Sequence, residues 1–259
     1  MTARNPEKQR RAIQRIISDH PGAKIEGLHV DYLNGFGNIE DCAEQFKDRN
    51  LPLHGLINNI GTENPADIKS KEGFDPTQAS NYLGHFYLTH MLLENLMETP
   101  QSRVGQEVEL QKRLRSVGSS TDIFSAHPGV AQTDAFRKSD KSKVMARIMA
   151  SGADLIGQSP GGGAQSLVRC ATDPALTGMG GGDRHWGSWY TGIPFQPFGS
   201  TWPLCFTVNW NNMGYRSPIN PLIRDPEACT KLYLATLDLV NECAATKLAA
   251  CGERSVSAR

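Results

Sequence analysis

The chain has 259 residues, of which 39% are hydrophobic, so it is long and apolar enough to bury a core and is predicted to be folded. Its 27 Lys and Arg residues balance 27 Asp and Glu residues, which excludes a basic field that would bind nucleic acid or an anionic membrane surface. The six cysteines show no C-x-x-C spacing, and no run of 18 apolar residues occurs. We therefore expect reduced thiols, no metal site, no membrane span and a cytoplasmic protein.

The first half of the chain alternates expected helices and strands. Residues 6–18 are predicted to form a helix capped by Asn5, followed by a short strand over 24–30. Further elements are expected in the order helix, buried strand, long helix, helix end and strand, over residues 38–48, 53–60, 79–97, 108–115 and 122–126. This alternation predicts an α/β sheet with helices on its faces.

The second half is less regular. Residues 172–221 are rich in Gly, Pro, Trp and Asn and are predicted to form an irregular segment, whereas 226–249 is expected to form a helix entered through Asp225. The glycine triplets at 161–163 and 180–182 lack the G-x-G-x-x-G spacing between a strand and a helix, so they do not predict a phosphate loop. No repeat or composition shift marks a second domain, so residues 1–259 are predicted to form one domain.

Three short motifs follow one another along the chain. They are Asn58-Asn59-Ile60-Gly61 after the expected strand, Asn81-Tyr82-Leu83-Gly84-His85-Phe86 in the long helix, and His127-Pro128-Gly129-Val130 followed by Thr133. Each alone has an ordinary interpretation as a turn, a strand end or, for His85, a packed histidine. In this order they resemble the N-N-A-G, N-x-x-G-x-F and Pro-Gly motifs of the short-chain dehydrogenases/reductases, above all the retinol-dehydrogenase-like members. The resemblance covers roughly residues 3–136, and 226–240 resembles the family's terminal helix.

The resemblance implies a Rossmann-like, doubly wound sheet and a redox reaction in which NAD(P) acts on a small carbonyl or alcohol substrate. It implies a catalytic role for Asn81. A basic residue where Arg4 stands is typical of NADP binding, because it can pair with the 2′-phosphate. The implied cofactor-binding residues are Arg4, Asp31, Asn58, Asn59, Gly61, Pro128, Gly129 and Thr133.

Parts of the family pattern are missing from this sequence. No T-G-x-x-x-G-x-G loop occurs, and Met1 matches the end of the family's second strand, so the first strand, most of the second and the N-terminal glycine loop are expected to be absent. Residues 102–104 resemble the start of the fifth strand and 106–115 the end of the following helix. The catalytic Tyr-x-x-x-Lys and the fifth strand are therefore expected to be deleted between them.

These gaps predict an incomplete fold. The strand over 53–60 would lose both of its neighbours, so the remaining strands are expected to pair in a smaller sheet or to expose their edges. No tyrosine has a lysine four residues later, so the chain is expected to be inactive. A substitute pair of Tyr82 or Tyr87 with Lys112 is conceivable, but nothing in the sequence favours it.

Two alternatives to an oxidoreductase remain open. One is a catalytically silent module that binds a protein partner through exposed sheet edges or through the Trp-rich segment 178–221. The other is a fragment without a stable function.

Overall fold

The structure is a computed structural model that describes residues 1–62, 68–105, 108–127, 159–180, 185–187, 215–216, 225–249 and 251. The strands are β1 (Thr2–Ala3), β2 (Leu28–His29), β3 (Gly55–Ile57), β4 (Arg103–Gly105), β5 (Asp122–His127), β6 (His185–Gly187) and β7 (Tyr215–Arg216). The helices are α1 (Pro6–Asp19), α2 (Phe36–Lys47), α3 (Pro76–Gln78), α4 (Gly84–Met91), α5 (Leu93–Glu98), α6 (Val108–Ser116), α8 (Pro160–Thr172) and α9 (Pro226–Cys243). A π-helical turn, η1 (Ala79–Leu83), joins α3 to α4, and a 3-10 turn, η2 (Pro174–Leu176), follows α8.

The strands form two sheets. β1 and β2 pair in parallel, with Thr2 opposite Leu28, and the second sheet has the order β3-β4-β5-β6-β7. All neighbours in the second sheet are parallel except β6 and β7. The prediction of an incomplete Rossmann-like α/β fold is confirmed. The expectation that no strand would lie between the segments 53–60 and 122–126 is wrong, because Arg103–Gly105 pairs with Gly55–Ile57 on one side and with Asp122–Phe124 on the other.

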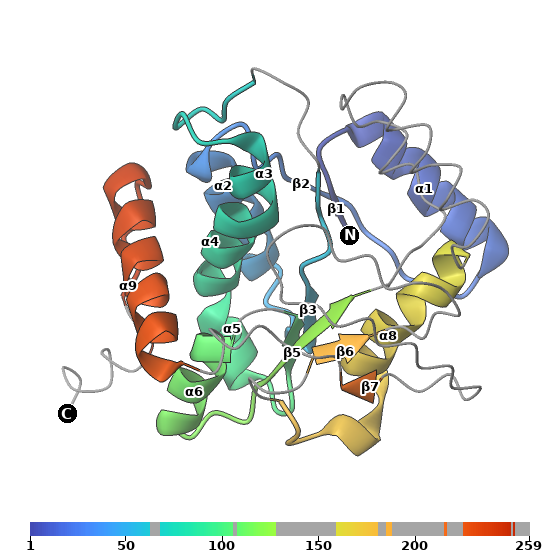
Figure 1. The fold of residues 1–259 in the computed structure, drawn as a ribbon. Coiled ribbons are helices and arrows are strands. Elements are labelled where there is room, and N and C mark those ends of the chain that lie inside the picture. Colours follow the sequence, from blue (N-terminus) through green and yellow to red (C-terminus); the bar gives the residue numbers. More distant parts are fainter. Residues whose placement is uncertain are drawn as a thin grey trace, which may run out of the picture.

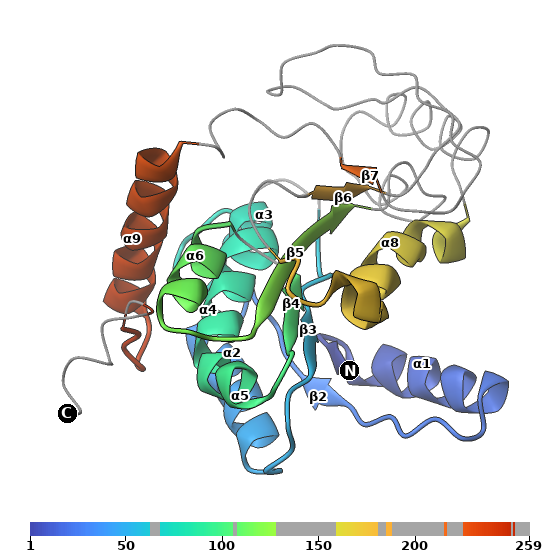
Figure 2. The same cartoon turned by 90° about the horizontal axis from the view of Figure 1, so that it is seen from below.

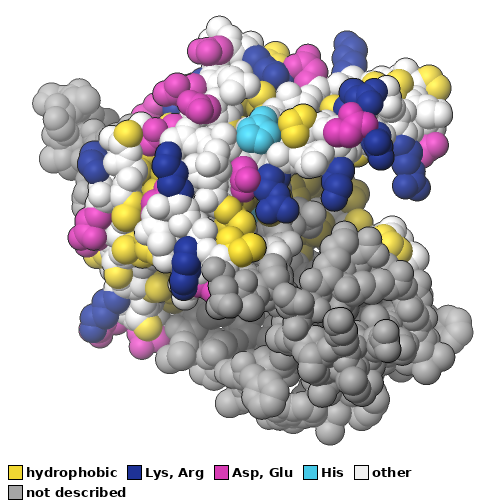
Figure 3. Space-filling view, turned by 90° about the horizontal axis from the view of Figure 1, so that it is seen from above, with side chains coloured by type: hydrophobic (Ala, Val, Ile, Leu, Met, Phe, Trp, Pro, Cys, Tyr) yellow, Lys and Arg dark blue, Asp and Glu magenta, His cyan; other side chains and the backbone are white. Residues whose placement is uncertain are grey.

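Helices cover both faces of the strands. Figures 1 and 2 show α1 and α8 on one side and α2, α4 and α6 on the other, with α9 as an outer layer. The main core lies on the side of α2, α4 and α6, and α9 closes it; its most buried side chains include Ile39, Phe86, Leu96, Leu114 and Tyr233. By contrast, α1 contributes no buried residue. On the face seen from above, Lys and Arg side chains are interspersed with Asp and Glu over the described residues (Figure 3).

The long helix expected over 79–97 is present but interrupted. It begins one turn earlier, because Pro76 starts α3 and the Asp75 carboxylate accepts hydrogen bonds from the backbone N–H groups of Thr77 and Gln78. The π-helical turn η1 follows, and Leu92, with φ −101° and ψ 8°, separates α4 from α5. Single π-helical turns inside α-helices are rare and occur frequently at functional sites.

Several predicted boundaries are corrected by the structure. The strand predicted over 24–30 is reduced to Leu28–His29, and the strand predicted over 53–60 is reduced to Gly55–Ile57. That strand is not fully buried, since 52% of Ile57 is exposed at the end of the five-stranded sheet. The segment predicted to be irregular contains η2, β6 and β7 among its described residues.

Helix α8 was not predicted, and its C-terminal end is fixed to the sheet by Arg103. This arginine of β4 donates hydrogen bonds to the carbonyl oxygens of Cys170 (3.0 Å) and Asp173 (2.8 Å) and to the Thr177 hydroxyl (3.0 Å). The last carbonyls of a helix have no partner within the helix, so a buried guanidinium can satisfy them. α8 is thereby held on β4 and β5.

Gly84, the first residue of α4, has no space for a side chain. A Cβ atom there would lie 2.6 Å from Cγ of Tyr32 and 2.9 Å from the Ala79 carbonyl oxygen. We expect Gly84→Ala to lower the free energy of unfolding by about 1 to 3 kcal/mol, because overpacking forces the ring or the helix to move. Urea denaturation measures the change.

The matched control for Gly84→Ala is Gly37→Ala in α2. A Cβ atom at Gly37 meets nothing within 4 Å, and the backbone there is helical. This variant should raise stability by about 0.4 to 1 kcal/mol, because alanine restricts the unfolded chain. Equal effects at the two positions would contradict the packing assigned to Gly84.

Candidate functional site

The loop after β3 is held against the helical run that contains η1 and α4. Asn58 follows β3 directly, and its side-chain Nδ2 donates a hydrogen bond to Oγ1 of Thr89 at 2.9 Å. Asn59 and Gly61 are exposed. The first two residues of the predicted N-N-x-G motif therefore differ in their surroundings. Asn58 is hydrogen-bonded to α4, whereas the Asn59 side chain is exposed to solvent.

Asn81 lies in η1 and binds the same loop. Its Oδ1 accepts hydrogen bonds from the backbone N–H of Thr62 (2.8 Å) and from the Ser80 hydroxyl (2.8 Å), and its Nδ2 donates to the Thr62 carbonyl oxygen (3.0 Å). A Cβ atom at Gly61 would lie 3.8 Å from Asn81 Oδ1. The structure thus brings together Gly61 and Asn81, two predicted site residues that are far apart in the sequence.

His85, one turn later, reaches the loop from the buried side. Its Nε2 lies 2.6 Å from the Ile60 carbonyl oxygen, and its Nδ1 lies 3.3 Å from the Tyr32 hydroxyl. Burial lowers the pKa of His85. The prediction of a packed histidine is confirmed, since the residue is 5% exposed. The hydrogen bond to Ile60 was not predicted, because nothing in the sequence pairs a helix residue with a particular loop carbonyl.

Arg4 and Asp31 follow β1 and β2, the two strands of the smaller sheet. Arg4 is exposed, and its carbonyl oxygen accepts a hydrogen bond from Nε2 of His29 at 3.1 Å. Asp31 is half-buried and shapes its own turn, because its Oδ1 accepts from the Leu33 N–H at 3.0 Å while its backbone N–H donates to Asn38. Both residues stand just beyond the carboxyl ends of adjacent parallel strands, the position at which α/β sheets bind ligands.

The remaining predicted residues, Pro128, Gly129 and Thr133, lie outside the described residues. Gly161–Gly163, for which no phosphate loop was predicted, form the first turn of α8, and Oγ of Ser159 accepts a hydrogen bond from the Gly162 N–H at 3.1 Å. The triplet opens a helix, and its spacing differs from G-x-G-x-x-G. Among the described residues no cluster of His, Cys, Asp and Glu is arranged to hold a metal ion.

The two tyrosines near Asn81 are engaged elsewhere. The Tyr82 hydroxyl lies 2.9 Å from Oγ1 of Thr236 in α9. The Tyr87 hydroxyl donates to the Glu40 carboxylate, and burial together with that contact raises the pKa of Tyr87. Lys112 pairs with Glu109 at 3.7 Å. A general acid-base tyrosine needs a lowered pKa, so this arrangement does not make a substitute catalytic pair.

No family model matches the chain. Human polyprenol dehydrogenase is 26% identical over 219 residues, which are 68% of this chain and 66% of that protein. The short-chain dehydrogenase/reductase drtF of Aspergillus calidoustus is 32% identical over 130 residues, which are 50% of this chain and 40% of that protein. The chain therefore spans less than two thirds of the length of these relatives.

A solved short-chain dehydrogenase from Salmonella enterica serovar Typhi superposes with a TM-score of 0.54 at 15% identity, covering 72% of this chain and 83% of that one. This likeness concerns the fold. Within the described residues, no helix is long and apolar enough to cross a membrane.

Proposed function

We propose that this chain is a member of the short-chain dehydrogenase/reductase family, whose members it resembles in sequence and fold, and that the loops after β1, β2 and β3 bind the adenosine half of NADP. Arg4 would pair with the 2′-phosphate and Asp31 would lie on the adenine side. Gly61 would let the cofactor approach the backbone, because among the described residues the nearest atoms to the place a side chain would occupy belong to Asn81 and lie 3.8 to 3.9 Å away. Asn58, Asn59, Pro128, Gly129 and Thr133 complete the proposed set.

In the family reaction NADPH would supply a hydride to a small carbonyl compound, or NADP⁺ would accept one from an alcohol. Asn81 is the residue of this chain proposed to help hold the proton path, and its exposed position in η1 leaves it accessible to a ligand. Its amide is held by three hydrogen bonds to Ser80 and Thr62, which fix its orientation. Such preorganisation is what a positioning amide in an active site requires.

We further propose that this chain does not turn over carbonyl substrates at rates typical of the family. The observation that carries this is the connection between β4 and α6: β4 ends at Gly105 and α6 begins at Val108, so two residues stand where the family carries Tyr-x-x-x-Lys. The missing proton transfer is worth about two to four orders of magnitude in rate.

The experiment compares two nucleotides that differ at the 2′ position. We expect 2′,5′-ADP to bind more tightly than AMP, and Arg4→Ala to weaken 2′,5′-ADP about tenfold while leaving AMP unchanged, because a charge-assisted bond to the 2′-phosphate is lost. Isothermal titration calorimetry measures both affinities. Lys8→Ala, at a neighbouring exposed position on α1, is the control and should change neither.

Turnover is tested separately with NADPH and a panel of aldehydes and ketones. No protein-dependent loss of absorbance at the nicotinamide band is expected. Catalysed NADPH oxidation would overturn the proposed inactivity, and a chain that binds neither nucleotide would overturn the proposed binding site.

A second candidate function, a silent module that binds another polypeptide, has one specific observation in its favour. β3 is the terminal strand of the five-stranded sheet, and Ile57 on it is half exposed. Such edges can pair with another chain. Self-association that Ile57→Lys abolishes, measured by light scattering, would support this candidate, and a monomer at all concentrations would count against it. For either function we propose a cytoplasmic location, with Cys42, Cys170, Cys243 and Cys251 as reduced thiols.

A further inference from the structure

Two loops of the proposed site are joined by a buried pair of side chains. Tyr32 comes directly after Asp31 in the loop that follows β2, and His85 lies in α4. The Tyr32 hydroxyl lies 3.3 Å from Nδ1 of His85, and the two rings meet edge to face with centroids 5.0 Å apart. Tyr32 is 6% exposed and His85 is 5% exposed, so water does not compete for this contact.

The direction of the hydrogen bonds follows from the third partner. The Ile60 carbonyl oxygen can only accept, so Nε2 of His85, at 2.6 Å, carries the proton. Nδ1 is then an acceptor and receives the hydroxyl proton of Tyr32. Burial lowers the pKa of His85 and raises that of Tyr32, so both groups stay neutral. The result is a directed chain from Tyr32 through His85 to the backbone of the loop after β3.

The same stretch of helix holds both loops at further points. The Tyr32 ring packs against Gly84, where a Cβ atom would be 2.6 Å from Cγ of the ring. Asn81 binds both backbone groups of Thr62, two residues beyond Ile60. One helical turn therefore determines where the loop after β2 and the loop after β3 stand relative to each other.

We propose that His85 is a positioning residue that couples these two loops by holding Tyr32 and Ile60 at a fixed separation. At that separation Asp31 and Gly61 can contact the same bound dinucleotide. The inference rests on the proposed function for its consequence, because a shared ligand is what makes the separation matter. A ligand that spans two loops binds more weakly when the loops no longer hold their bound geometry before it arrives.

The test removes one hydroxyl. Tyr32→Phe keeps the ring against Gly84 but deletes the proton that His85 receives. We expect the affinity for 2′,5′-ADP to fall about fivefold, the effect of one lost hydrogen bond. We also expect faster hydrogen exchange at the Thr62 amide, which is protected by Asn81 in the loop that His85 holds.

Tyr82→Phe is the matched control. It removes a tyrosine hydroxyl from the same helical run, but that hydroxyl contacts Thr236 in α9, away from both loops. Both variants should unfold at similar urea concentrations, and only Tyr32→Phe should change nucleotide affinity and exchange at Thr62. If the two variants behave alike in both measurements, the coupling is refuted.

Failure of the loop coupling can be distinguished from failure of the proposed nucleotide binding. If the wild-type chain does not bind 2′,5′-ADP, the nucleotide site is rejected, and the exchange rate at Thr62 alone decides the coupling. Faster exchange in Tyr32→Phe than in Tyr82→Phe then supports it, and equal rates overturn it.

Discussion

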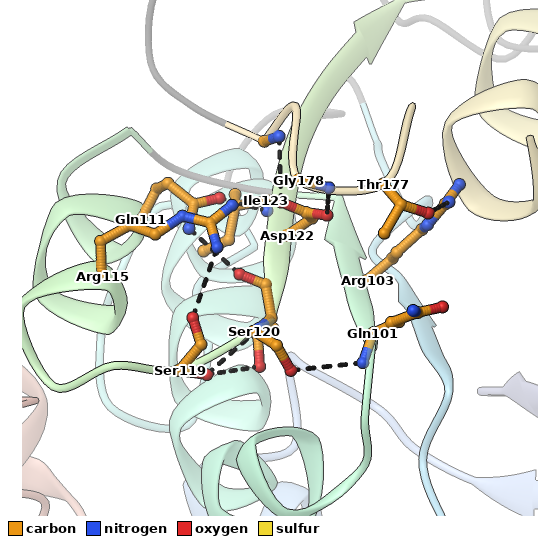
Figure 4. Close-up of polar contacts among 12 residues, drawn as sticks. Gln101, Arg103, Gln111, Arg115, Ser119, Ser120, Asp122, Ile123, Thr177 and Gly178 are labelled. Carbon is orange, nitrogen blue, oxygen red and sulfur yellow. Dashed lines mark hydrogen bonds and ion pairs between the residues drawn. The ribbon is translucent and has the colours of Figure 1, made fainter. Parts of the chain in front are cut away.

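Replacing Asp122 with asparagine is expected to lower the free energy of unfolding by about 3 to 5 kcal/mol, the largest effect of any substitution considered. Asp122 opens β5 and is 1% exposed. Its Oδ2 accepts from the Gly178 N–H at 2.6 Å, its Oδ1 accepts from the Gly180 N–H at 3.0 Å, and Arg115 forms an ion pair with it (Figure 4). Asparagine offers one acceptor oxygen in place of two and leaves the Arg115 charge without its partner.

Urea denaturation of Asp122→Asn measures this loss. Glu26→Gln is the matched control, because it makes the same carboxylate-to-amide change at an ion pair with Arg49 in which the Glu26 side chain is 72% exposed. An exposed pair of this kind contributes less than about 1 kcal/mol. Comparable losses in the two variants would show that the Asp122 cluster does not anchor the segment after α8.

The second large effect is a loss of stability in mild acid. His90 is buried in α4; its Nδ1 donates to the Phe86 carbonyl oxygen at 2.8 Å, so its Nε2 accepts from the Tyr233 hydroxyl at 2.9 Å. Burial, with a smaller effect of the Arg113 charge, lowers the pKa of His90 from 6.5 to about 4. Protonation would remove the acceptor that holds Tyr233 of α9.

The direction of the change in stability with pH follows from proton uptake by His90. Between pH 6.5 and 4 the unfolded chain binds a proton at this histidine and the folded chain does not, so stability falls as the pH falls. At about 1.4 kcal/mol per pH unit, the lowering of the His90 pKa from 6.5 to about 4 corresponds to about 3 kcal/mol of stability, which is present above pH 6.5 and lost by pH 4. The lowered pKa of His85 acts in the same direction.

Urea unfolding at a series of pH values checks this prediction. His90→Gln cannot titrate in this range, so its stability should depend less steeply on pH than that of the wild type, although it should be less stable at pH 7. A His90→Gln curve parallel to the wild-type curve would assign the acid sensitivity to other groups.

The sequence was sufficient for elements that have strong local signals. α1 was predicted within one residue because Asn5 and Pro6 mark its start, and the Asn5 side chain does accept from the Lys8 N–H. The start of α9 was predicted from Asp225-Pro226, because the Asp225 carboxylate caps the first turn, but the helix ends at Cys243 and not at residue 249 as predicted. In both cases the capping residue acts within one turn of the chain, so its effect is visible in the sequence.

The elements that were missed depend on tertiary contacts. α8 opens with Pro160 and three glycines, and its buried positions are Gly163, Ser166 and Cys170, so no apolar stripe reveals it. β4 has three residues and includes a buried arginine, which is too short for an alternating pattern. Both are stabilised by each other, through the hydrogen bonds of Arg103.

The candidate site shows the same division. The order of the motifs along the chain predicted that Gly61 and Asn81 belong to the same site, and the two residues are neighbours in the structure. The π-helical turn that presents Asn81, and the path from Tyr32 through His85 to Ile60, depend on how α4 packs against two loops. Their roles in binding NADP remain predictions.

The position of the connection between β4 and α6 bears on what an insertion there would do to the sheet. The pairs that fix the sheet, Gly55 with Arg103 and Arg103 with Asp122, all lie before or after that connection. We therefore expect residues placed between Gly105 and Val108 to leave the existing register intact. The point at which the family carries its catalytic tyrosine and lysine is thus one at which we expect this fold to accept an insertion.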